Sequence, residues 1–211
     1  GANLTDTNLS GADLTHTDLS GANLAGANLA GANLTGANLR QSNFTGMVLT
    51  DVKLSGVDLT GSNLAGADLT EVNLTGATLI NVDLSGANLS GANLTDVSLS
   101  GANLCNVSVI GADLTGADLT GASLTGADVT RVNLMGATLS DTDLAGANLT
   151  GAVLSDRDLR SVKLTAANLA DSDLRSVNLT GVDLCGVNLT GANLTGTNLA
   201  GANLTDTNLS G

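Results

Sequence analysis

Leucine recurs at every fifth residue of this chain, from Leu4 to Leu209, without a single slip of register. Counted from Gly1, the sequence divides into consecutive pentads, and the fourth position of each is Leu apart from three substitutions. The second position is a small residue (Ala, Val, Ser or Thr) with two exceptions. The substitutions at the fourth position are Phe44, Val109 and Val129. The exceptions at the second position are Met47 and Arg157.

A period of five residues fits neither an α-helix, which repeats its faces every 3.6 residues, nor a strand, which repeats every two. Each pentad is therefore predicted to be a short extended segment followed by a turn, so that every Leu returns to one interior. Positions two and four share a face of an extended segment, so both should point inward. Self-similarity this strict predicts a stacked, all-β solenoid. The predicted core ladder includes Leu4, Phe44, Leu104 and Leu209.

The polar positions of the pentad predict how the chain turns. Every glycine occupies position one, where tolerance of positive φ suits a corner between two sides. Position three is mostly Asn or Asp, whose short side chains can bond nearby backbone at a turn. Backbone groups of one layer are then expected to pair with the next layer about 4.8 Å away.

Pentads such as Gly1-Ala2-Asn3-Leu4-Thr5 and Gly111-Ala112-Asp113-Leu114-Thr115 closely resemble those of the pentapeptide-repeat proteins, and the resemblance covers the whole chain. That family folds as a right-handed quadrilateral β-helix with four pentads per coil. The resemblance therefore implies one domain over residues 1–211 with about 10.5 coils, roughly 50 Å long at about 4.8 Å per coil, and no helical domain.

The inventory of reactive side chains predicts a protein that is not an enzyme and holds no cofactor or metal. His16 is the only histidine and falls at a corner. Cys105 and Cys185 occupy the same pentad position four implied coils apart, roughly 19 Å, which is too far for a disulfide. Free thiols favour a reducing compartment such as the cytoplasm. No glycine pattern of a phosphate-binding loop is present, and no base lies near a Ser or Thr to activate it.

The formal net charge of −13 argues against direct binding to nucleic acid or to an anionic membrane. Some relatives in the resembled family inhibit DNA gyrase, which implies an alternative function as an acidic DNA mimic that binds a type II topoisomerase. A DNA duplex of roughly 50 Å carries about 30 negative charges, more than twice the net negative charge of this chain. The charges also spread over all four implied sides. The first hypothesis is therefore a structural or protein-interaction element, whose protein partner the sequence does not identify.

Two local departures from the pattern stand out. The pentad Asp156-Arg157-Asp158-Leu159-Arg160 places Arg157 where a small inward residue belongs. An unpaired buried charge is very costly, so either the coil distorts or Arg157 reaches out beside its aspartates. We interpret the pentad as a tolerated defect, or alternatively as a partner-contact site formed by its four charged residues.

The second departure lies nearer the start of the chain. Phe44, Met47 and Val48 enlarge the side chains locally, which predicts repacking of the core there.

The first and last stretches of the sequence, residues 1–11 and 201–211, are identical and lie 200 residues apart. An uncapped coil exposes unpaired ladder groups that can template another chain. Self-association end to end into a filament is one hypothesis, and excision from a longer array is another. An engineered consensus scaffold fits the regularity but not the irregular substitutions between residues 41 and 180.

Overall fold

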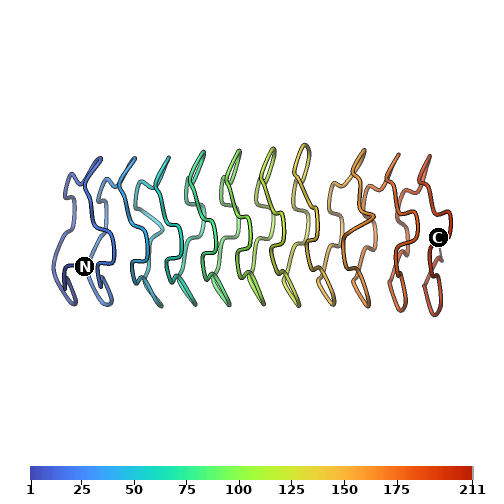
Figure 1. Cartoon of the computed structure of the whole chain (residues 1–211), viewed down its shortest axis with the longest axis horizontal. Helices are drawn as coiled ribbons and strands as arrows, with labels where there is room; N and C mark the ends of the chain where they lie inside the picture. Colours follow the sequence, from blue (N-terminus) through green and yellow to red (C-terminus); the bar gives the residue numbers. More distant parts are fainter. Residues whose placement is uncertain (211) are drawn as a thin grey trace.

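A computed structural model describes residues 1–210 as a stack of similar coils along one long axis, with the two ends of the chain at opposite ends of the stack (Figure 1). Parallel bridges join residues that are 20 apart in the sequence, from Asn3 with Asn23 to Asn188 with Asn208. One turn of the solenoid therefore takes four pentads, which the five-residue period alone could not establish.

The β character of the coils is confined to isolated bridges. Position three of each pentad forms the bridge, positions five and one form the turn, and residues 1–210 contain neither a helix nor a strand of several residues. The sequence predicted strand-like layers, and the structure reduces them to one bridged residue per side. The reason is geometric, because a turn in every pentad leaves only positions two to four extended.

Three backbone bonds per regular pentad connect a coil to its neighbours, including one from the corner amide, as Asp96 donates to the carbonyl of Thr115 over 2.9 Å. The amide of Leu94 donates to the carbonyl of Asp113 over 2.8 Å, and the amide of Asn93 donates back to Val72 of the preceding coil over 2.9 Å. Within the pentad, the side chain at position three accepts from the amide at position five, as Asn93 Oδ1 does from Thr95 over 3.0 Å. The polar position therefore caps the turn that follows it.

Position one adopts positive φ whether or not it is glycine. Gly111 has φ 63° and Asn81 has φ 54°, so the corner requires the left-handed conformation itself. Among the corners from Asp6 to Asp206, only Asp51 and Ser161 lack a positive φ.

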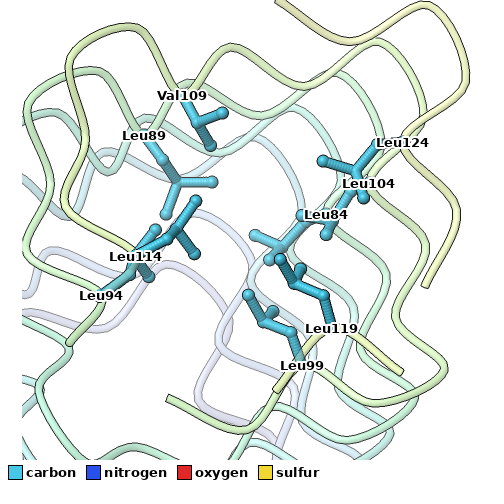
Figure 2. A pocket seen from close by; sticks show the side chains of 9 residues that line it. All are labelled: Leu84, Leu89, Leu94, Leu99, Leu104, Val109, Leu114, Leu119 and Leu124. Atoms are coloured by element: carbon cyan, nitrogen blue, oxygen red, sulfur yellow. The ribbon is translucent and has the colours of Figure 1, made fainter. Parts of the chain in front are cut away.

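The interior is a column of leucines edged by small residues. Leu104 is 2% exposed and Phe44 is 1% exposed. Figure 2 shows the leucines between Leu84 and Leu124, with Val109 among them, pointing into one shared interior. Polar residues at position two are satisfied locally, since the buried Ser62 hydroxyl donates to the carbonyl of Leu39 over 2.6 Å.

The two end coils differ from the rest of the column. Leu4 is only partly buried, and Leu209 is 51% exposed, whereas Phe44 and Leu104 lie fully inside the column. Each leucine is covered by the coils on both sides of it, and the last coil of the structure has a neighbour on one side only.

Candidate interaction surface

The outer surface has four sides, which we number by the pentads that form them. The first side consists of the pentads that begin at residues 1, 21, 41 and so on. The second, third and fourth sides begin at residues 6, 11 and 16 and repeat every 20 residues. Most side chains on these surfaces are short and polar, and many of their atoms already bond within the fold.

Arg157 interrupts the ladder of backbone bridges between coils on the fourth side. The bridge between position 138 and position 158 is missing, and neither Leu139 nor Asp158 donates its amide across the gap. The Arg157 side chain is partly buried, with Nε donating to Ser155 O over 3.2 Å and Nη1 approaching Ala137 O at 3.5 Å. Ala137 O is the carbonyl that the amide of Asp158 would reach in the regular pattern. The coil therefore distorts, and backbone carbonyls solvate the charge.

The other charged residues of this pentad do not pair with Arg157. Arg160 forms a two-point ion pair with Asp158, with Nη2 to Oδ2 at 2.6 Å and Nε to Oδ1 at 2.9 Å. The hydrogen bond from Arg160 lowers the pKa of Asp158 below its ordinary value. Asp156 is an exposed corner with φ 61°. The structure thus brings Asp158 and Arg160 together and leaves Arg157 bonded to backbone carbonyls.

A matching gap lies on the second side, at Met47. Phe44 is accommodated with its ladder intact, and Met47 is buried at 5% exposure, but the bridge between position 28 and position 48 is missing. Val48 points outward with 67% of its surface exposed, so the prediction that it repacks the core is wrong. Position three faces outward in every coil, and a change of side chain does not alter that direction.

Both gaps open a crevice between neighbouring coils. The crevice beside Met47 has a volume of about 470 Å³ and is lined by residues 26–30 and 45–48. The one beside Arg157 has a volume of about 340 Å³ and is lined by Ser140, Asp158, Arg160 and Ser161. The sequence marks both places as departures from the pattern, but it suggested a contact site only at the second and repacking of the core at the first.

Two further gaps follow immediately along the chain, at Lys53 with Asn73 and at Lys163 with Asp183. At each of them, valine at position two lies against valine at position two of the next coil, and the chain contains only these two such pairs. The pairs are Val52 with Val72 and Val162 with Val182. We call residues 46–55 the Met47 seam and residues 156–165 the Arg157 seam.

Each seam also contains one of the two corners that lack positive φ, Asp51 in the Met47 seam and Ser161 in the Arg157 seam. The usual corner side chain occupies the space beside the glycine one coil later. Asn106 Oδ1, for example, would lie 2.8 Å from a Cβ on Gly126. Asp51 and Ser161 each have a neighbouring corner, Glu71 and Asp141, that is not glycine. Asp156 and Ser176 are also adjacent non-glycine corners and both keep positive φ, so a second side chain at the neighbouring corner accompanies the change at Asp51 and Ser161 without being sufficient for it.

The remaining candidate chemistry is sparse. Within residues 1–210, no group of three His, Cys, Asp or Glu residues is placed to hold a metal ion. His16 is exposed at its corner, and Cys105 and Cys185 are free thiols of intermediate exposure. A search of the described residues finds no helix capable of crossing a membrane.

The other ion pairs are isolated and exposed. They join Arg40 to Asp58, Lys163 to Asp143 and Arg175 to Asp173, with each basic side chain more than half exposed. Such pairs contribute little to stability. Most of the acidic side chains therefore remain free to set the negative potential of the surface.

These features define a β-solenoid built from stacked pentads. The family model described as pentapeptide repeats matches in eight copies, at residues 2–41, 27–66, 58–96, 98–136, 117–156, 133–175, 152–191 and 172–211. The chain belongs to the pentapeptide-repeat family.

Solved structures of the same family resemble this chain over most of its length. HetL, a pentapeptide-repeat protein involved in heterocyst differentiation regulation from the cyanobacterium Nostoc sp. strain PCC 7120, is 32% identical over 98% of this chain and 89% of its own, with a TM-score of 0.42. QnrB1, a plasmid-mediated fluoroquinolone resistance protein, is 18% identical over 92% and 91%, with a TM-score of 0.51. The second likeness supports the fold alone. A search of curated protein sequences found no match.

Proposed function

We propose that this protein is a non-enzymatic scaffold that acts through its outer surface as a structural or protein-interaction element. The observation that carries the proposal is the filled interior. The space among the core side chains from Leu84 to Leu124 amounts to about 10 Å³ and is lined by apolar side chains only. A space of that size holds at most about one water molecule, so these coils enclose no chamber for a substrate. Binding must therefore take place on the sides or at the ends.

Self-association end to end is the form of interaction that we favour. Leu204 and Leu209 are 38% and 51% exposed in the last coil, and the leucines of the first coil are only partly buried. The identical stretches at 1–11 and 201–211 lie a whole number of coils apart, because 200 residues is ten times the 20-residue turn. A second copy stacked end to end on the first would cover both sets of leucines.

Sedimentation or light scattering of the 211-residue chain across a dilution series tests this proposal. We expect the apparent mass to rise with concentration above the 20.6 kDa of the monomer. The double variant Leu204→Asp/Leu209→Asp, which places charge on the exposed end, should stay monomeric. A monodisperse unmodified chain at high concentration would reject stacking and leave the interaction to the four sides.

The second candidate is an acidic DNA mimic that binds a type II topoisomerase such as DNA gyrase. It is supported by the net charge of −13 and by the shared fold with QnrB1, itself described as a fluoroquinolone resistance protein. Spreading of the charge over four sides weighs against it. A gyrase supercoiling assay distinguishes the two functions, since a DNA mimic should inhibit at micromolar concentration and a pure scaffold should not.

We take residues 1–211 as one right-handed β-helix of about 10.5 coils that binds neither nucleic acid nor membranes directly, as the family resemblance and the acidic surface favour. Arg157 and its pentad then act as a tolerated distortion of the wall, with the exposed Asp158–Arg160 pair as the alternative contact point for a partner.

A further inference from the structure

The two seams repeat one pattern of lost contacts, displaced by 110 residues along the chain. In the Met47 seam the bridges 28–48 and 53–73 are missing, and in the Arg157 seam the bridges 138–158 and 163–183 are missing. The corner between the two gaps is Asp51 in one seam and Ser161 in the other, and both have left the left-handed conformation. Elsewhere in the described chain, from Asn3 to Asn208, the series of bridges is unbroken.

Each gap opens only one side of the coil. Around the 28–48 gap, the flanking bridges Asn23–Asn43 and Asn33–Lys53 remain. Around the 138–158 gap, the flanking bridges Asn133–Val153 and Asp143–Lys163 also remain. The coils at a seam are thus held on the other sides and separated on one, which is the arrangement of a hinge. In Figure 1 the orange stretch near residue 160 departs from the outline that the neighbouring coils repeat.

We propose that the two seams are built-in sites of local opening that divide the solenoid into three cooperatively folded blocks. The blocks are residues 1–45, 56–155 and 166–210. In a stacked repeat protein each unit contacts only its neighbours, so stability is a sum of unit and interface contributions. An interface that has lost part of its ladder is therefore where the array separates first.

The placement of the seams gives the opening a direction. The Met47 seam occupies the second and third sides, and the Arg157 seam occupies the fourth and first sides. These pairs of sides face opposite directions around the axis. Opening of the two seams therefore bends the rod in opposite senses, and the middle block, residues 56–155, is displaced sideways relative to both ends.

Hydrogen exchange resolved by NMR tests the proposal on amides that are bonded in the structure. Leu24 and Leu34 donate across the Met47 seam interface to Asn43 O and Lys53 O, over 3.1 and 2.9 Å. Leu84 and Leu94 make the same bonds in the middle block, over 2.8 Å each. Local opening predicts exchange at Leu24 and Leu34 at least about tenfold faster than at Leu84 and Leu94. Equal protection of the two pairs would overturn the proposal, because it would mean that the gap is a static irregularity.

A variant that closes the seam supplies the matched comparison. Met47→Ala/Val52→Ala places alanine at position two in both pentads of the seam and removes the contact between two valines, and exchange at Leu24 and Leu34 should slow toward that of Leu84. Val57→Ala is the control, because Val57 lies between Ala37 and Ala77 in an intact ladder. It should not slow exchange at any of these amides. Slowing by the control, or none by the double variant, would contradict the assignment of the opening to the seam.

Discussion

Replacing Leu104 by alanine tests how the solenoid is held together. Leu104 is 2% exposed, and its amide donates to Ser123 O over 2.7 Å, which ties its coil to the next one. The ladder keeps neighbouring coils at a fixed spacing, so the wall cannot collapse into the space that the side chain leaves. Buried Leu→Ala changes cost about 2–5 kcal/mol, with the larger values where the site cannot relax. We therefore expect a loss of about 3–5 kcal/mol in the free energy of unfolding.

Leu209→Ala is the matched control, because Leu209 has the same pentad position but is 51% exposed. With only about half of its surface buried, its truncation should cost about 1 kcal/mol. Urea denaturation followed by circular dichroism measures both variants. With a slope of about 1–3 kcal/mol per molar urea, the Leu104→Ala midpoint should fall by about 1–5 M, and the Leu209→Ala midpoint much less. Equal losses for the two variants would refute the view that stacking on both sides makes the core.

Two further predictions concern charged residues. Arg157→Ala should raise the free energy of unfolding by about 1–2 kcal/mol, because it allows the two backbone bonds at position 158 to form. The control Arg131→Ala, at an exposed corner with an intact ladder, should change the free energy of unfolding little. Destabilisation by Arg157→Ala in thermal unfolding would argue against the strain assigned to that side chain. The hydrogen bond from Arg175 lowers the pKa of Asp173 below its ordinary value of 3.8, so the stability that this carboxylate contributes is present above that pH and is lost as the pH falls through the lowered pKa. NMR titration of the Asp173 carboxyl should show its pKa rise toward 3.8 in Arg175→Gln, and an unchanged pKa would rule out the pairing.

Much of the architecture follows from the period and the residue preferences of the pentad. The inward direction of positions two and four, the corner at position one and the turn-capping role of position three all come from short-range geometry that each pentad repeats. The number of sides does not, because a five-residue period is compatible with any closed turn. It entered through the family resemblance, and the bridges between residues 20 apart supply it directly.

The seams illustrate what the pentad pattern alone could not reveal. Val52 and Val72 are each ordinary residues for position two, and only their stacking in adjacent coils coincides with a gap. The conflict becomes visible after the sequence is aligned in rows of 20. The pattern marks Arg157 as misplaced, but its contacts with the carbonyls of Ser155 and Ala137 depend on a distorted backbone that the sequence does not encode locally. The prediction for Val48 was wrong because it considered the size of the side chain without the direction of its position.

Threonine shows why the valine pairs behave differently from other branched residues. Thr142 lies against Val162 in the next coil, and the bridge between Asp143 and Lys163 is retained. Its hydroxyl donates to the carbonyl of Leu119 over 2.9 Å, which holds the branched side chain against the backbone of the preceding coil. Valine has no such bond to fix it. The chemistry of position two, and not its volume alone, therefore decides where the ladder holds.

The most direct test of this central claim is to create a new seam where none exists. Ala77→Val would insert a third valine between Val57 and Val97, on a side whose bridges 58–78 and 78–98 are intact. Ala147→Val is the control, because its neighbours Ala127 and Ala167 leave room for one branched residue. Hydrogen exchange of Ala77→Val should show lost protection at the amides of Leu59 and Leu79, with full protection kept in Ala147→Val. Unchanged protection in both variants would contradict the claim that valine stacked on valine at position two opens the ladder.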